Sequence, residues 1–273
     1  MTTSRLLLEY DGSGFAGWAS QPGLRTVQAE LERALCVLLR ADAVPVTVAG
    51  RTDTGVHALG QVASYVGPVV PVRSLNALLP DDVAVLSCAE AADSFDARRD
   101  ATSRAYCYRV LARRGRPALD RGRMLHWPHS VDVDALVACA AALVGTHDFT
   151  AFTPTETEHV RFSRDVLAAF WRRAPVGLSG AARVSGPAGV SGGAGSVEGG
   201  EVLEFWIEAD AFMRHMNRVL VGTMLEVASD RRSIEDFVSL LDGRPRSAAG
   251  PTAPAGGLYL VGVGYDGERV LPS

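Results

Sequence analysis

One short segment, residues 50–55 with the sequence GRTDTG, brings together groups that can do chemistry. Glycine at both ends lets the backbone turn tightly and lets a ligand approach closely. Arg51 and Asp53 are two positions apart, so in an extended segment they project to the same side. A guanidinium a few ångströms away would lower the pKa of the carboxyl and keep it ionised. An ionised aspartate can act as a nucleophile or base. The alternative is a plain turn whose aspartate caps the backbone.

A second segment concentrates positive charge. The net charge of the chain is −4, and its 27 basic residues are all arginine, a side chain that can bind phosphate through two parallel hydrogen bonds. Between Arg98 and Arg123, arginines exceed aspartates by seven. The arginines are Arg98, Arg99, Arg104, Arg109, Arg113, Arg114, Arg116, Arg121 and Arg123. By itself such a run favours a solvated charged face with internal ion pairs, and the alternative is a surface that binds the phosphates of a nucleic acid.

The histidines and cysteines do not form a metal-binding pattern. None of the four cysteines belongs to a Cys-x-x-Cys motif. His126 and His129 flank a Trp-Pro pair without a third ligand beside them. His57 follows the GRTDTG segment, where a structural hydrogen bond is the more ordinary role for a single histidine. We therefore expect no metal and no disulfide framework, which fits a reducing compartment.

Composition indicates a folded protein outside the membrane. A chain of 273 residues makes one large domain or two ordinary ones, and 47% hydrophobic residues exclude global disorder. The longest nearly uncharged apolar run, residues 135–144, is too short to cross a bilayer. The N-terminus has no signal-peptide pattern. We expect a cytoplasmic protein.

The elements that must position these residues alternate between strands and helices. Period-two apolar patterns predict strands, and apolar residues three and four apart predict helices that start at capping residues. The predicted strands are 5–10, 45–48, 61–66, 83–88, 105–111, 166–171, 202–209 and 258–265. The predicted helices are 26–39, 132–144, 212–227 and 233–243. Short connections favour an α+β fold with mainly antiparallel sheet. The Gly/Ser-rich stretch 177–200 predicts a flexible loop.

The GRTDTG segment continues into a longer signature. Residues 51–57, RTDTGVH, followed by GQV at 60–62, resemble the signature of tRNA pseudouridine synthases of the TruA type. Further landmarks of that family follow in chain order. They are Tyr10-Asp11-Gly12, Gly17-Trp18, Thr26-Val27-Gln28, Leu79-Pro80, Arg104, Tyr106, His147-Asp148-Phe149, Met216, Arg218 and Ala253-Pro254-Ala255. The resemblance spans nearly the whole chain except the Gly/Ser-rich stretch.

The resemblance implies an architecture. It implies the pseudouridine synthase fold, with two α+β halves of mainly antiparallel sheet flanked by helices and an RNA-binding cleft between them. Residues 1–105 would form an N-terminal domain that carries the catalytic loop, and residues 106–273 a C-terminal domain. It also implies a homodimer that binds the anticodon stem-loop of tRNA.

The resemblance also implies an activity and its residues. The protein would isomerise uridine to pseudouridine at tRNA positions 38, 39 and 40. Asp53 would be the catalytic carboxylate, with Arg51 and Arg218 supplying positive charge. Tyr106 would stack on the target uracil, and Arg98 and Arg104 would bind substrate. The reaction exchanges an N1–C1′ bond for a C5–C1′ bond without net oxidation, so we expect no cofactor.

Two other functions stay open at this stage. A catalytically silent tRNA-binding protein of the same fold would keep the arginines without turnover. A hydrolase that uses Asp53 on a small glycoside would need a second carboxylate placed as acid, and no partner is evident near the motif.

Overall fold

The computed structural model describes residues 2–157, 160–174 and 200–272, and groups them into two compact units. Met1–Arg104 and Tyr259–Val270 form the first unit; Ala105–Leu258 and Leu271–Ser273 form the second. The flexible loop predicted for 177–200 lies outside the described residues, apart from Gly200.

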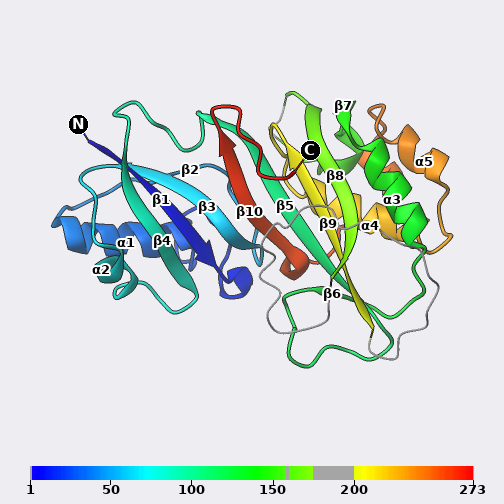
Figure 1. The fold of residues 1–273 in the computed structure, drawn as a ribbon, viewed down its shortest axis with the longest axis horizontal. Helices are drawn as coiled ribbons and strands as arrows, with labels where there is room; N and C mark the ends of the chain where they lie inside the picture. Colours follow the sequence, from blue (N-terminus) through cyan, green and yellow to red (C-terminus); the bar gives the residue numbers. More distant parts are fainter. Residues whose placement is uncertain (1, 158–159, 175–199, 273) are drawn as a thin grey trace. The chain divides into compact units, whose positions relative to one another are not determined.

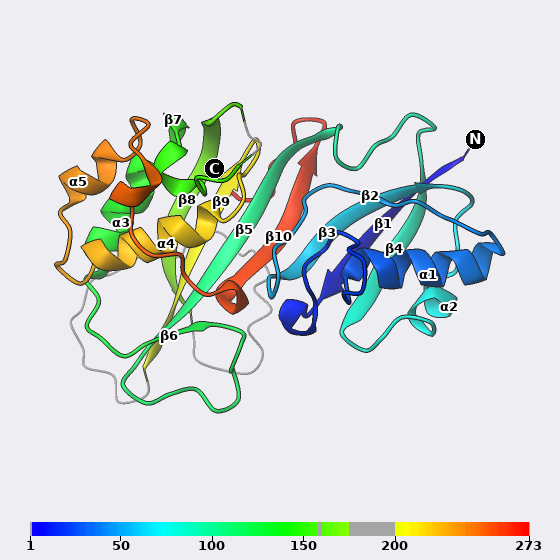
Figure 2. The same cartoon turned by 180° about the vertical axis from the view of Figure 1, so that it is seen from behind.

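The first unit is an antiparallel sheet with two helices on one face (Figures 1 and 2). Its strands are β1 (Thr3–Tyr10), β2 (Thr47–Val48), β3 (His57–Val66), β4 (Val83–Ala91) and β10 (Leu258–Tyr265). Its helices are α1 (Val27–Leu39), α2 (Val72–Asn76) and the 3-10 turn η1 (Gly12–Gly14). The strand order is β4-β1-β3-β10, with β2 also on β3. Only the β3–β10 pair is parallel among the pairings described in this unit.

Local sequence explains why these elements form. The side chain of Thr26 accepts a hydrogen bond from the amide of Ala29 and so caps α1. Leu31 and Leu35 then fall one turn apart on the buried face of that helix. In β1, alternate side chains enter the core, and Leu6 and Leu8 are completely buried.

The second unit has the same layered arrangement. Its strands are β5 (Ala101–Ala112, from Ala105 onward in this unit), β6 (Leu125–Trp127), β7 (Gly145–Asp148), β8 (Ser163–Ala174) and β9 (Glu201–Ala209). Its helices are α3 (Val133–Ala142), α4 (Met216–Val227) and α5 (Ile234–Ser239), with η2 (Thr150–Phe152), η3 (Arg246–Ala248) and η4 (Ala255–Gly257). The strand order is β5-β9-β8-β7, with β6 parallel to β5.

Helices α3 and α4 cover one face of this second sheet (Figure 2). The indole N–H of Trp171 on β8 donates to the sulfur of Met224 on α4, 3.5 Å away. Phe205 on β9 packs against the Trp171 ring. Most residues of α4 are buried, so the helix is a central element of the core rather than a surface helix.

The predicted α+β class with mainly antiparallel sheet is confirmed. Most predicted elements differ from the structure by a few residues at their ends, and three differences stand out. Helix α4 begins at Met216 rather than residue 212, because His215 adopts a left-handed conformation (φ 63°) that no α-helix continues through. Helix α5 ends at Ser239 rather than residue 243. The last strand groups with the first unit, because β10 pairs in parallel with β3. Within the described residues, no helix is long and apolar enough to cross a membrane.

Candidate active site

The GRTDTG segment is the loop between β2 and β3 of the first unit, and Thr52 fixes its centre. The Thr52 side chain is buried, and its hydroxyl lies 2.8 Å from the hydroxyl of Tyr10 at the end of β1. Burial raises the pKa of Tyr10 to about 12, so this hydroxyl keeps its proton at neutral pH. Because Thr52 is buried and hydrogen-bonded in the core, its neighbours Arg51 and Asp53 lie at the surface of the loop.

Two further side chains hold the start of the loop. The Gln61 amide on β3 donates to the carbonyl of Gly50 (2.7 Å) and to the Tyr10 hydroxyl (3.3 Å). The Arg104 guanidinium donates through Nε and Nη2 to the carbonyl of Ala49, at 3.1 and 2.9 Å. These bonds fix the backbone immediately before the loop, so its position is set by the sheet.

A second chain segment packs backbone to backbone against the loop. The amide of Trp18 donates to the carbonyl of Thr52 at 3.1 Å. Gly17 has φ +98°, and a Cβ there would lie 2.8 Å from the same carbonyl oxygen. Glycine is therefore required at position 17 for two reasons, the left-handed backbone and the close approach. The Gly17-Trp18 pair is thus part of the scaffold of the loop.

Asp53 itself is half-buried, between the exposed Arg51 and Thr54. The carbonyl of Asp53 accepts a hydrogen bond from the amide of Val56, which closes a tight turn, and Gly55 in that turn has φ +79°. The arrangement presents one carboxylate on a loop of fixed backbone. Such a group can serve as a nucleophile or base toward a substrate that reaches the loop.

His57 has a structural role in this arrangement. The ring is buried and stacks on Tyr259 of β10, with centroids 4.7 Å apart. Its Nδ1 accepts a hydrogen bond from the amide of Gly12 at 3.0 Å and lies 3.2 Å from a carboxylate oxygen of Asp11. The histidine joins the end of β1 to β3, as expected for a structural hydrogen-bonding group.

The tyrosine predicted to stack on the uracil lies on β5 in the second unit. Tyr106 and Tyr108 are two apart on β5 and share a face of that strand. The Tyr106 ring is buried and meets the ring of Phe212 edge-on, with centroids 4.9 Å apart. Tyr108 is fully buried, and its hydroxyl donates to the carbonyl of Pro254 at 2.7 Å. Tyr108 therefore packs in the core.

Arg218 lies in the first turn of α4 and is half-buried. Its Nε donates to the carbonyl of Ala253 at 2.7 Å, and the amide of Ala253 donates back to the carbonyl of Arg218 at 3.0 Å. The pKa of Tyr108 is raised by burial, and the positive charge of Arg218 acts against that rise. Arg218 and Tyr108 bond the adjacent carbonyls of Ala253 and Pro254.

The arginine-rich segment is divided by the structure. Arg98, Arg99 and Arg104 belong to the first unit and the other six to the second. Arg104 is bonded to backbone carbonyls, including that of Arg98, and Arg109 pairs with the buried Glu204. Within the arginine-rich segment, the exposed arginines of the second unit are Arg114, Arg116, Arg121 and Arg123. These four lie in the connection between β5 and β6, so exposed positive charge is concentrated in that connection.

Among the residues that the structure describes, no group of three or more His, Cys, Asp or Glu side chains is placed to hold a metal ion.

Comparison with known proteins identifies the family. The sequence profile described as tRNA pseudouridine synthase matches residues 139–266. The chain is 36% identical to tRNA pseudouridine synthase A of Bacillus pumilus over 265 residues, which cover 95% of this chain and 97% of that protein. It is 39% identical to the Myxococcus xanthus protein of the same name, over 97% of this chain and 92% of that one. The chain belongs to the tRNA pseudouridine synthase A family. The family is one of isomerases, and the resemblance inferred from the RTDTGVH signature is confirmed.

Only part of the candidate site could be seen in the sequence. The signature residues and Tyr10 were visible in the sequence, but the bonds among Tyr10, Thr52 and Gln61 were not. The contacts of Arg218 with Ala253 were also missed, since nothing in either sequence segment indicates its partner. The only available signal was the Ala-Pro-Ala landmark at 253–255.

Proposed function

We propose that this chain isomerises uridine to pseudouridine at positions 38, 39 and 40 in the anticodon stem-loop of tRNA, with Asp53 as the catalytic carboxylate. The observation that carries the proposal is the family signature folded into a loop that is held before Asp53 by Thr52 and Gln61 and closed after it by the bond from the Val56 amide. A carboxylate held in this way can attack C1′ or remove a ribose proton, and either step opens the glycosidic bond. No electrons are transferred overall, so the reaction needs only acid–base and covalent chemistry.

The other residues have proposed roles toward the same uridine. Tyr106 stacks on the detached uracil, and base–aromatic stacking is worth about 1–3 kcal/mol. Its edge contact with Phe212 supports this role, because the contact holds the ring in one orientation. Arg51 and Arg218 supply positive charge near the reacting carboxylate and the RNA backbone.

Binding must offset the free energy of extruding the target base, a few kcal/mol. We assign this contribution to phosphate contacts of the arginines, which are charge-assisted hydrogen bonds. The exposed arginines between β5 and β6 support that assignment. Arg98 is exposed and suited to direct contact, whereas Arg104 acts on RNA through the loop that it holds. The two units act as two domains, with residues 259–270 belonging to the N-terminal one, and the protein works as a cytoplasmic homodimer.

Mapping of pseudouridine in tRNA incubated with the purified protein tests the proposal. New pseudouridines confined to positions 38–40 support it. Modification elsewhere in tRNA would overturn the site assignment. Tight tRNA binding with no pseudouridine would indicate the catalytically silent RNA-binding protein, and turnover of a free nucleoside would indicate the hydrolase.

A further inference from the structure

Residues 248–254 run along helix α4, and we call this segment the strap. At one end, Nη2 of Arg232 donates to the carbonyl of Ala248 at 2.9 Å. In the middle, the amide of Gly250 donates to the hydroxyl of Thr223 at 3.0 Å. At the other end, Ala253 exchanges two hydrogen bonds with Arg218. The strap therefore runs antiparallel to the helix and ends at the arginine of the proposed site.

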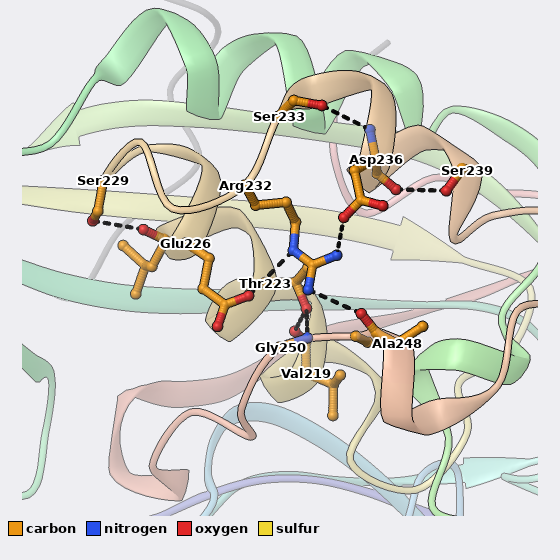
Figure 3. A network of polar contacts seen from close by, with 12 residues as sticks. Val219, Thr223, Glu226, Ser229, Arg232, Ser233, Asp236, Ser239, Ala248 and Gly250 are labelled. Atoms are coloured by element: carbon orange, nitrogen blue, oxygen red, sulfur yellow. Dashed lines mark hydrogen bonds and ion pairs between the residues drawn. The ribbon is translucent and has the colours of Figure 1, made fainter.

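Arg232 anchors the first end of the strap (Figure 3). Its side chain is largely buried, with 14% exposed. Besides Ala248, its guanidinium bonds Glu226 on α4 at 3.2 Å and forms an ion pair with Asp236 on α5. Acceptors on three sides fix the plane of the guanidinium. The beginning of the strap is thereby tied to both helices.

Thr223 and Gly222 set the distance between the strap and the helix. Thr223 is fully buried, and its hydroxyl donates to the carbonyl of Val219 at 2.7 Å, so its lone pairs face the amide of Gly250. A Cβ at position 222 would overlap the carbonyl oxygen of Pro251. The strap thus lies directly on the helix backbone, where a single added methyl group would displace it.

The far end of the strap receives the side chain of Arg218. The carbonyl of Ala253 takes the Nε hydrogen of Arg218, and the carbonyl of Pro254 takes the hydroxyl hydrogen of Tyr108. A guanidinium bonded through Nε has its plane fixed, and its two terminal nitrogens are then directed by that bond. The orientation of Arg218 therefore depends on where the strap places the Ala253 carbonyl.

We propose that the strap positions Arg218 for catalysis, and that Gly222, Thr223 and Arg232 are positioning residues that act through it. The inference rests on the proposed function of Arg218. It predicts that loosening the strap is harmful only while Arg218 is present, because the strap itself touches neither substrate nor Asp53 in this scheme. If the strap were purely structural, loosening it would lower the rate by the same factor with or without Arg218.

A double-mutant cycle tests this dependence. Single-turnover release of tritium from tRNA labelled at uracil C5 is measured for Thr223→Val, Arg218→Met and the double variant. We expect Thr223→Val to slow release about tenfold, since small misplacements of a catalytic group have effects of this order or larger. We expect less than about a twofold further loss when Arg218 is already methionine. Thr223→Ser keeps the hydroxyl and should restore the rate.

Ser229→Ala is the matched control. Ser229 lies just after the same helix, and its hydroxyl donates to the carbonyl of Leu225 at 2.7 Å, as the Thr223 hydroxyl donates to Val219. We expect Ser229→Ala to leave the rate of tritium release unchanged, with or without Arg218. Equal losses for Thr223→Val in both backgrounds, or no loss at all, would overturn the positioning role. A wild-type rate for Arg218→Met would instead remove Arg218 from the proposed function and the strap's role with it.

The strap contact also has a readout that needs no turnover. Hydrogen exchange at the amide of Gly250 should accelerate in Thr223→Val and stay slow in Ser229→Ala, with melting temperatures lowered by only a few degrees in both variants. Unchanged exchange would show that Thr223 does not hold the strap. Faster exchange at Gly250, together with equal rate losses for Thr223→Val in both backgrounds, would show that Thr223 holds the strap but that the strap does not act through Arg218.

Discussion

Tyr10 and Thr52 share a buried hydrogen bond, 2.8 Å between hydroxyl oxygens, one residue before the aspartate assigned to catalysis. The bond joins the end of β1 to the loop that precedes β3. The Gln61 amide donates to the same tyrosine hydroxyl and to the carbonyl of Gly50. A loop fixed by side chains of two strands keeps its carboxylate in place without rearrangement during the reaction, the condition under which positioning contributes most to rate.

Tyr10→Phe removes this hydroxyl and leaves the ring. We expect a loss of about 1 kcal/mol in the free energy of unfolding, the usual effect of one hydrogen bond. We also expect the single-turnover rate to fall about tenfold with unchanged tRNA affinity, because the loop loosens while the RNA contacts remain. Urea unfolding, tritium release and filter binding measure the three quantities.

Tyr65→Phe is the control for that variant. Tyr65 is also a buried tyrosine of the first unit, and its hydroxyl donates to the carbonyl of Pro68 at 2.8 Å. It should show a comparable stability loss with a wild-type rate. If both variants slow the reaction equally, the Tyr10–Thr52 bond has no special connection with the catalytic loop.

Gly17→Ala tests the close approach of the second segment to the loop. Alanine at φ +98° is strained, and its Cβ would press on the carbonyl of Thr52. We expect destabilisation of about 1–3 kcal/mol together with a reduced rate, measured by thermal unfolding and tritium release. Gly23→Ala separates the two causes, since Gly23 has φ +74° and nothing within 4 Å of the added Cβ. Equal effects at both positions would assign the result to backbone strain alone.

Salt dependence tests the basic connection between β5 and β6. Replacing Arg114, Arg116 and Arg121 with glutamine should lower the slope of log Kd against log salt by about 1 for each phosphate group that the variant no longer binds. Arg99→Gln is the control, because Arg99 is paired with Asp100 at 2.8 Å. An unchanged slope in the triple variant would remove these arginines from the RNA surface.

Local patterns in the sequence predicted most of the elements. The strand Leu258–Tyr265 and the cap of α1 at Thr26 are as predicted, because each depends on residues close together in the chain. The start of α4 was misplaced because Phe212 continues the apolar pattern, while the left-handed backbone of His215 has no signal in that pattern. The short elements α2, β6 and β7 were not predicted at all, since three to five residues carry too little periodicity.

The sequence named candidate residues for the site but not the contacts that hold them. Counting charges between Arg98 and Arg123 gave one basic surface, but Arg109 is neutralised by Glu204, a residue 95 positions later in the sequence. Ion pairs of this kind depend on which strands are neighbours in the sheet, and charge counting along the sequence carries no information about strand order. The strap was invisible for the same reason, because Thr223 and Gly250 meet only when the chain has folded.

The most direct test of the account is tritium release by Asp53→Asn with tRNA labelled at uracil C5. The amide has nearly the same shape as the carboxyl group but can neither attack C1′ nor accept a ribose proton. The account predicts no detectable release, with tRNA affinity within about twofold of wild type, since phosphate contacts carry most of the binding. Substantial tritium release by that variant would contradict the assignment of Asp53 as the catalytic carboxylate.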